Sequence, residues 1–192
     1  ITAASVLTQM IRLHQIICGH IKTDDGEIKS IKSNRIKELL EVLEETNGKV
    51  IIWAVYRYDI QQIEKTLGEK YGKESVATYY GDTKDNIRQS IVDRFMDPNS
   101  DLRFFVGNPK TGGYGLTLTS SHTVVYYSND YSLEVRLQSE DRAHRIGQTS
   151  KVTYVDLMAD HTIDEKIVKA LNAKIDLASQ VMGEDPKKIL FG

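Results

Sequence analysis

The most constraining feature of the sequence is an uninterrupted apolar run, Val50-Ile51-Ile52-Trp53-Ala54-Val55. A strand with one face in water alternates apolar and polar residues, whereas a strand that is buried on both faces is apolar throughout. The run therefore predicts a central strand of a parallel sheet. Helices must cover both faces of such a sheet, so the rest of the chain has to supply them.

Strand-like and helix-like segments alternate along the rest of the chain. Further strands are predicted at residues 75–80, 102–106, 123–127 and 152–158. Apolar residues at helical spacing predict a helix from Thr2 to Cys18 and another from Thr162 to about Val181. A third helix is predicted after a cap at Ser33 or Asn34, and a fourth carries Ile60, Ile63 and Leu67. A fifth is predicted to be capped by Asp82 or Thr83 and to bury Ile87, Ile91 and Phe95. This order predicts an α/β fold with a mainly parallel sheet.

The length of 192 residues is enough for one substantial core. We therefore predict a single domain over residues 1–192, with a leading helix and hairpin at 1–32, a sheet core at 33–160, and a trailing helix and tail at 161–192. The hairpin is predicted from Asp25-Gly26, a turn pair between two short β-prone stretches. Because the chain begins with Ile1 already in helical pattern, we expect it to be a fragment of a longer protein.

Composition excludes several classes of protein. The net charge of −2 is not that of a strongly basic chain, so a nucleic-acid partner must be held by local cations and backbone amides. The single cysteine, Cys18, excludes an internal disulfide framework and favours an intracellular protein. No apolar run approaches the roughly 18 residues of a membrane span. The spacing of His14, Cys18 and His20 offers only three metal ligands, so we assign them structural roles and predict no metal site.

Three predicted loops follow strands of the sheet, where ligands of parallel α/β proteins collect. They are Tyr56-Arg57-Tyr58, Tyr80-Gly81-Asp82-Thr83, and residues 108–115, which read Asn-Pro-Lys-Thr-Gly-Gly-Tyr-Gly. Glycine lets a backbone approach a phosphate closely, and exposed amides donate to it. Each loop by itself also fits ordinary turn chemistry. The three loops on one sheet edge favour a polyanionic partner.

The segment 138–148 contains Arg142 and Arg145, three residues apart, with Gln138 four residues before the first. On a helix all three would share one face, and the planar guanidinium suits phosphate oxygens. A solvated, salt-bridged helix surface is the alternative. The chain has no Gly-x-x-x-x-Gly-Lys-Ser/Thr phosphate loop and no strand that ends in paired carboxylates for magnesium. Arginines suited to a γ-phosphate without a cradle for the nucleotide indicate half of a composite site.

These residues resemble a known family. Segment 138–148, Gln-Ser-Glu-Asp-Arg-Ala-His-Arg-Ile-Gly-Gln, is similar to the last helicase motif of the Swi/Snf-type ATPases, the double-stranded-DNA translocases and chromatin remodellers of helicase superfamily two. Other segments resemble further motifs of the family in the family's order, at residues 12–20, 33–53, 80–95 and 110–118. The resemblance spans nearly the whole chain.

The resemblance implies a C-terminal RecA-like lobe, with three layers and a mainly parallel central sheet flanked by helices. ATP and Mg²⁺ would be held mainly by an N-terminal lobe outside this chain. Carried over by position, Arg142 and Arg145 are the implied catalytic residues that face the γ-phosphate, with Arg145 as the best candidate for an arginine finger and Gln138 in support.

Further site residues are implied in the same way. Near the ribose and phosphates the resemblance places Gly113, Gly115 and Thr117. Against the DNA backbone it places Arg57, Gly81, Thr83, Lys110 and Thr111. The implied partners are duplex DNA and the N-terminal ATPase lobe of the same protein, with no membrane, and the protein is predicted to be monomeric.

Two other functions stay open at this point. One is a strand-separating DNA or RNA helicase lobe, and the other is a non-catalytic nucleic-acid-binding module whose arginines only bind phosphate. We expect this chain alone to hydrolyse no ATP. The compact lobe resembles bacterial or phage members of the family, which predicts a cytoplasmic location, or a nuclear one if the source is eukaryotic.

Overall fold

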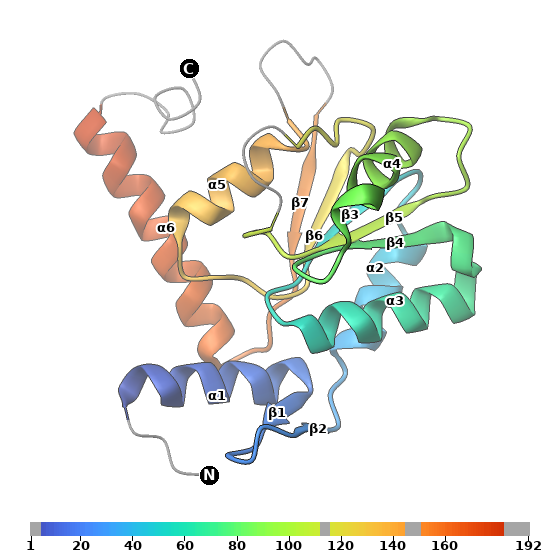
Figure 1. Ribbon diagram of the computed structural model, residues 1–192. Coiled ribbons are helices and arrows are strands. Elements are labelled where there is room, and N and C mark those ends of the chain that lie inside the picture. Colours follow the sequence, from blue (N-terminus) through green and yellow to red (C-terminus); the bar gives the residue numbers. More distant parts are fainter. Residues whose placement is uncertain (1–4, 112–115, 145–150, 183–192) are drawn as a thin grey trace.

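Five parallel strands form the centre of the structure, with helices packed around them (Figure 1). The computed structural model describes residues 5–111, 116–144 and 151–182. The strands of the main sheet are β3 (Val50–Trp53), β4 (Val76–Tyr79), β5 (Phe104–Gly107), β6 (Thr123–Tyr126) and β7 (Thr153–Asp156). The α-helices are α1 (Val6–Cys18), α2 (Arg35–Glu44), α3 (Arg57–Tyr71), α4 (Asp85–Met96), α5 (Leu133–Asp141) and α6 (Ile163–Met182).

The apolar run predicted as a central strand is β3, the middle strand of the sheet. The strand order is β4-β5-β3-β6-β7, and every pairing is parallel. Ile52 lies opposite Val106 on one side and Val125 on the other. Because all the strands run the same way, the loops that follow them meet at one edge of the sheet, as the sequence predicted.

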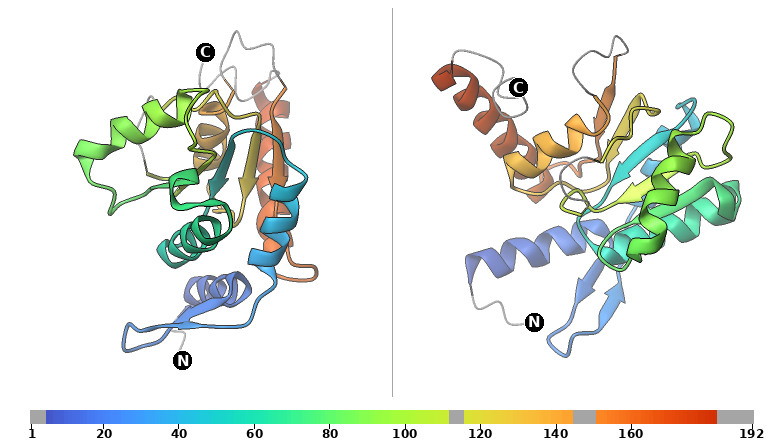
Figure 2. Two further views of the ribbon diagram at one scale, coloured as in Figure 1. Left: turned by 90° about the vertical axis from the view of Figure 1, so that its right-hand side faces the viewer. Right: turned by 45° about the horizontal axis from the view of Figure 1, so that its top comes forward.

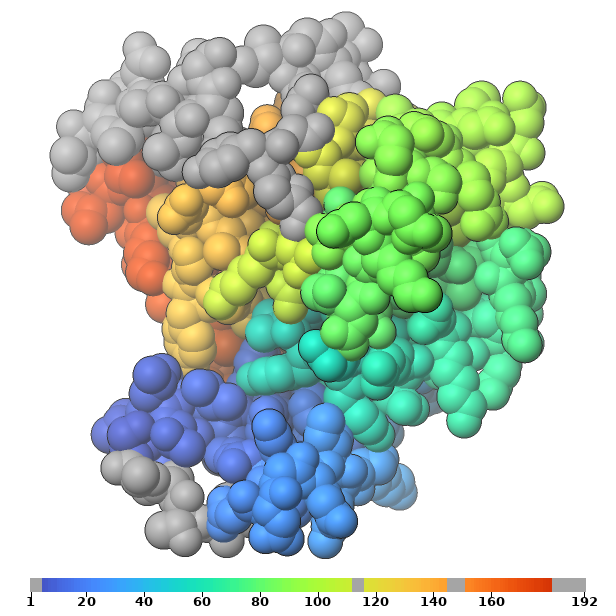
Figure 3. Space-filling view, viewed as in Figure 1, coloured from blue at the N-terminus to red at the C-terminus, as the bar shows by residue number. Residues whose placement is uncertain are grey.

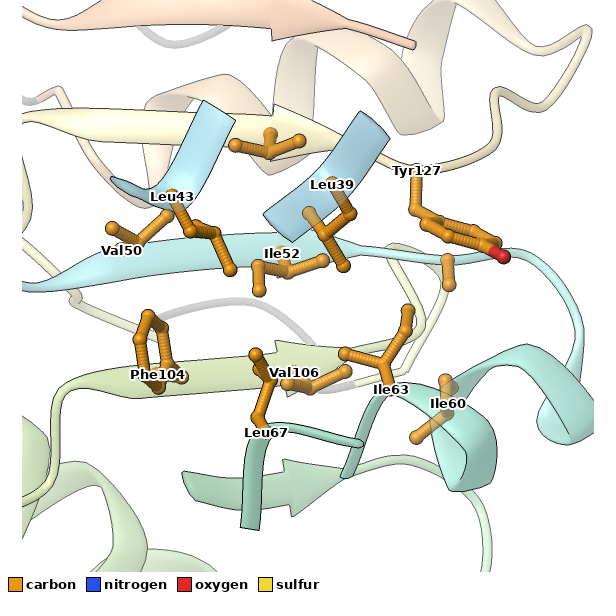
Figure 4. Packing of buried hydrophobic residues seen from close by; sticks show 12 residues of the cluster. Leu39, Leu43, Val50, Ile52, Ile60, Ile63, Leu67, Phe104, Val106 and Tyr127 are labelled. Carbon is orange, nitrogen blue, oxygen red and sulfur yellow. The ribbon is translucent and has the colours of Figure 1, made fainter. Parts of the chain in front are cut away.

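Side chains on the two faces of β3 belong to two separate hydrophobic cores, as expected for side chains that alternate along a strand. Val50 and Ile52 pack with residues of α2 and α3 on one face (Figure 4), and Ile51 and Trp53 pack with residues of α4 on the other. Residues 50–54 are all fully buried. Figure 2 shows α2 and α4 on opposite sides of the sheet. The predicted mainly parallel sheet flanked by helices is therefore confirmed.

The leading helix and hairpin lie together at one end of the molecule (Figure 3, blue). The predicted turn is present: β1 (His20–Lys22) pairs antiparallel with β2 (Ile28–Ser30), and Gly26 has a φ of 87°. α1 ends at Gly19, whose φ of 94° is the left-handed conformation that favours glycine. The end of the molecule that α1 covers is the carboxyl edge of the sheet, because the Tyr56 hydroxyl, just after β3, lies 3.0 Å from Nδ1 of His14.

Two predictions about α4 are wrong. The helix begins at Asp85 with Lys84 as its N-cap, and neither Asp82 nor Thr83 caps it. The Thr83 hydroxyl instead donates to the carbonyl oxygen of Thr78 and accepts from the N–H of Tyr80, so it closes the loop that precedes the helix. Ile87 was predicted on the buried stripe but is 43% exposed.

The prediction that both arginines share one helix face also needs correction. α5 ends at Asp141, and Arg142 is its C-cap. The carbonyl oxygen of Arg142 accepts from the N–H of Leu118 at 2.8 Å, so the chain turns toward the segment before β6. Arg145 lies outside the described residues. Within the parts of the chain that the structure describes, no helix is both long enough and apolar enough to cross a membrane.

Candidate functional site

Asn108 connects three of the loops at the carboxyl edge of the sheet. Its side-chain amide donates to the carbonyl oxygen of Val55 at 2.8 Å, and its backbone N–H donates to the carbonyl oxygen of Tyr79 at 3.2 Å. Its side-chain oxygen accepts from the N–H of Lys110 at 2.8 Å. The loops after β3, β4 and β5 are therefore held in fixed positions relative to one another.

Ser128 adds the loop after β6 to this arrangement. Its hydroxyl accepts from the N–H of Val55 at 2.9 Å, and the side chain is 1% exposed. Sequence reasoning assigned no role to Asn108 or Ser128. Both are short polar residues close behind a buried strand, and that position is the signal that could have identified them.

The two exposed cations predicted to contact DNA both lie at this edge, and both pair with carboxylates. Arg57, the first residue of α3, lies 2.9 Å from Asp82 in the loop after β4. Lys110, after β5, lies 2.7 Å from Asp130 in the loop after β6. Gly81 is exposed beside Asp82, and a Cβ atom at Gly81 would meet no atom within 4 Å.

Thr83 and Thr111 are placed differently from those cations. Thr83 is buried, and its hydroxyl is used within its own loop. Thr111 is half-buried; its N–H donates to the carbonyl oxygen of Asn108 at 2.9 Å, and its own carbonyl oxygen accepts from Arg142 at 3.2 Å. Thr111 thus connects the cation-bearing loop to the segment around Arg142.

Arg142 is buried without a carboxylate partner among the residues that the structure describes. Its guanidinium lies over the ring of Trp53, 5.2 Å from the centroid, and the bond to Thr111 is its one hydrogen bond to this part of the chain. Burial lowers the pKa of Arg142 from its ordinary value. Among the described residues this buried guanidinium has few partners, and a phosphate is the ligand that suits a guanidinium best.

Trp53 and Gly107 form the floor beneath Arg142. A Cβ atom at Gly107 would lie 2.8 Å from the Tyr79 carbonyl oxygen and 2.9 Å from Cζ3 of Trp53, so only glycine fits there. The Trp53 indole N–H is buried and has no hydrogen-bond partner in the described part of the chain. Sequence reasoning used Trp53 only as a strand residue.

The remaining predicted site residues are spread around Arg142. Gln138, on α5, donates to the Glu134 carboxylate at 3.0 Å. Thr117 is half-buried, just before the fully buried Leu118. Gly113, Gly115 and Arg145 lie outside the described residues. The structure thus brings Arg142, Thr111 and Lys110 to one region, while the side chain of Gln138 is bonded along its own helix.

A second buried guanidinium lies on the opposite face of the sheet, on α2. Arg35 bonds to the Asp164 carboxylate and to the carbonyl oxygens of Tyr127 and Leu157. Burial by itself would lower the pKa of Arg35, but its electrostatic interactions with Cys18 and Asp164 raise it above its ordinary value. The sequence carried no clear signal for this pairing, because Arg35 and Asp164 are 129 residues apart.

The two histidines of α1 and β1 have structural partners. Nε2 of His14 lies 3.5 Å from Asp164, and burial lowers the pKa of His14 to about 4. Nδ1 of His20 lies 3.0 Å from Asp59. Among the described residues, no group of three histidine, cysteine or carboxylate side chains could hold a metal ion.

Comparison with known proteins identifies the family. Residues 31–147 match the helicase conserved C-terminal domain. The ATP-dependent helicase fft2 of Schizosaccharomyces pombe is 31% identical over 185 residues, which cover 95% of this chain and 14% of that protein. The SWI/SNF-related matrix-associated actin-dependent regulator of chromatin subfamily A member 1 of Mus musculus is 38% identical over 166 residues, which cover 85% of this chain and 15% of that protein. The chain thus spans less than a fifth of either relative.

A solved structure agrees with this match. The crystal structure of the C-terminal part of the Fun30 ATPase domain superimposes with a TM-score of 0.65 at 27% identity, over 73% of this chain and 46% of that one. Both relatives named above are eukaryotic, so a bacterial or phage source stays a prediction. The family resemblance and the RecA-like fold are confirmed: the chain belongs to the helicase conserved C-terminal domain family, as a RecA-like C-terminal lobe of the Swi/Snf type.

Proposed function

We propose that this chain is the second motor lobe of an ATP-dependent double-stranded-DNA translocase. Residues 1–192 form one lobe, and a separate N-terminal lobe holds most of the ATP and the Mg²⁺. Arg142 and Arg145 reach the γ-phosphate of that nucleotide, and Gln138, Gly113, Gly115 and Thr117 lie around it. Bound ATP supplies the phosphoryl group whose transfer to water drives movement.

One observation carries this proposal: Arg142 is a buried guanidinium without a carboxylate among the described residues. Leaving a charge buried and unpaired is costly, so such a residue is expected where a ligand or a second lobe completes the pairing. Trp53 lies against the guanidinium from its ring face, a contact that takes up no N–H donor, and among the described residues only the Thr111 carbonyl oxygen accepts a hydrogen bond from it. Guanidinium donors match the oxygens of a transferring phosphoryl group.

The DNA part of the proposal rests on the same edge of the sheet. Arg57 and Lys110 present exposed cations, and Gly81 presents backbone without a side chain. Cations and backbone amides are the groups that bind phosphates without reading sequence. We therefore propose that Arg57, Gly81, Lys110, Thr83 and Thr111 form the DNA side of the lobe, with Thr83 acting through the shape of its loop.

Two substitutions in the full-length protein test the nucleotide role. Arg142→Gln and Arg145→Ala should each lower ATP turnover by about 10³–10⁵-fold, the usual contribution of an arginine finger, and leave duplex binding close to wild type. Arg94→Gln is the matched control, because Arg94 is an exposed arginine that pairs with Glu74 away from the site. Near-normal turnover in both site variants would refute the role. The 192-residue chain alone should hydrolyse no ATP.

Strand separation is the second candidate function, because the relative fft2 is named an ATP-dependent helicase. A translocase hydrolyses ATP on blunt duplex DNA without separating its strands. Comparing turnover with strand displacement on blunt and forked duplexes therefore distinguishes the two functions. Displacement that keeps pace with turnover on the forked substrate would favour the helicase.

A further inference from the structure

The exposed cations at the carboxyl edge are already occupied by carboxylates of the chain itself. Arg57 pairs with Asp82 at 2.9 Å, and Lys110 pairs with Asp130 at 2.7 Å. The cationic side chains are 60% and 57% exposed. Each pair joins segments that follow different strands, so each carboxylate reaches across the edge to a cation that is distant from it in the sequence.

The positions of the pairs are informative. Asp82 follows β4 and Arg57 follows β3, with β5 between these strands in the sheet. Asp130 follows β6 and Lys110 follows β5, with β3 between them. The two pairs therefore lie across the surface where the proposed DNA contacts are.

Stability does not account for these pairs. The Arg57–Asp82 pair contributes little to folding, because its side chains are 60% and 47% exposed and water already solvates both charges. In the other pair Lys110 is 57% exposed, whereas Asp130 is 18% exposed and also accepts from the N–H of Ser132. The loops at this edge are held instead by the hydrogen bonds of Asn108 and Ser128. The two ion pairs are thus not the main contacts that hold these loops in place.

We propose that Asp82 and Asp130 are internal competitors of DNA phosphate for Arg57 and Lys110. A carboxylate and a phosphate oxygen accept from the same donors, so a phosphate must displace the carboxylate and then lie beside its negative charge. The two aspartates thereby lower the affinity of this edge for the DNA backbone, which lets a moving lobe release each contact. This inference rests on the proposed function, since it requires that the edge binds DNA.

The test is a gain of affinity in the full-length protein. Asp82→Asn and Asp130→Asn should each tighten binding of a fluorescein-labelled blunt duplex, measured by anisotropy at low salt without nucleotide, by roughly two- to five-fold. Asparagine keeps the side-chain oxygen of residue 130 that accepts from the N–H of Ser132, so this loop should stay folded. Loss of a merely structural contact would weaken binding, which is the opposite sign.

Glu74→Gln is the matched control. Glu74 forms an exposed ion pair with Arg94 just before β4, at the opposite edge of the sheet, and its substitution changes the net charge by the same amount. A further arm repeats Asp82→Asn in an Arg57→Gln background, where the gain should disappear. Equal affinities for the aspartate variants and Glu74→Gln would overturn the competitor role alone. Failure of the wild type and every variant to bind duplex DNA would overturn the proposed DNA function as well.

Discussion

Two buried arginines on opposite faces of the same sheet differ in what surrounds their charge. Arg35 and Arg142 both lie over an aromatic ring, 5.6 Å from the centroid of Tyr127 and 5.2 Å from that of Trp53. Arg35 pairs with the buried Asp164, whereas Arg142 has no carboxylate in the described part of the chain. Their pKa values consequently move in opposite directions, raised for Arg35 and lowered for Arg142.

The difference separates an arginine that holds the fold from one whose charge is unpaired among the described residues, as the proposed nucleotide role requires. Arg35 joins α2 to the ends of β6 and β7 and to the start of α6, and its hydrogen bonds go to protein atoms. In the described part of the chain, Arg142 is supported by a ring face and one carbonyl oxygen. Burial alone therefore does not distinguish these two arginines; the presence of a buried counter-charge does.

Removing each charge should affect stability very differently, and this is the largest effect on stability expected. Arg35→Met leaves the Asp164 carboxylate buried without its cation, so we expect the free energy of unfolding to fall by about 3–5 kcal/mol. Arg142→Met orphans no described carboxylate and removes a buried charge, so stability should stay within about 0.5 kcal/mol of wild type or rise. Urea unfolding of both variants measures the contrast, and a loss at Arg142 as large as that at Arg35 would break it.

The stability of the buried network around Asp164, which includes Arg35, should also depend on pH through His14. Its folded pKa of about 4 lies below the ordinary value of 6.5, so the unfolded chain binds more protons between these two values. Stability contributed by neutral His14 is therefore present above about pH 6.5 and is lost as the pH falls toward 4, by about 3 kcal/mol in total.

Comparing wild type with His14→Gln isolates this term from the titration of the carboxylates. Urea midpoints measured across that range should converge at low pH, because the variant has no imidazole to protonate. Parallel pH profiles for the two proteins would show that folding leaves the pKa of His14 unchanged. They would also remove His14 from the buried network around Asp164.

The stability of the region around Arg142 should also depend on the close packing of Gly107 beside Trp53. This is the smallest of the three effects. Gly107→Ala places a methyl group 2.8 Å from the Tyr79 carbonyl oxygen and 2.9 Å from the Trp53 ring, so we expect a loss of about 1–3 kcal/mol in the free energy of unfolding. Gly81→Ala is the control, because its methyl group meets no neighbour within 4 Å. If both variants unfold at the same urea concentration, the close packing beneath Arg142 does not constrain residue 107.

Much of the fold could be predicted because its signals are local in the sequence. The apolar run at 50–55 required burial on both faces, and β3 is indeed the middle strand with helices on both sides. The turn at Asp25-Gly26 and the loops after β3, β4 and β5 follow from residue types within a few positions of one another. The motif at 138–148 identified the family for the same reason.

The site's electrostatics, in contrast, were decided by tertiary structure. Nothing near Arg35, Arg57 or Lys110 in the sequence indicates that the first is neutralised by Asp164 or that the others lie against carboxylates of neighbouring loops. The same holds for Thr83, whose hydroxyl bonds backward to β4 instead of capping α4. Hydrophobic periodicity is a property of residues close together in the sequence. Whether a charge is neutralised depends instead on its nearest partner in space, which is usually distant in the sequence. The sequence by itself therefore determined which loops meet at the carboxyl edge, and the fold decided which contacts hold those loops and which of their charges are paired.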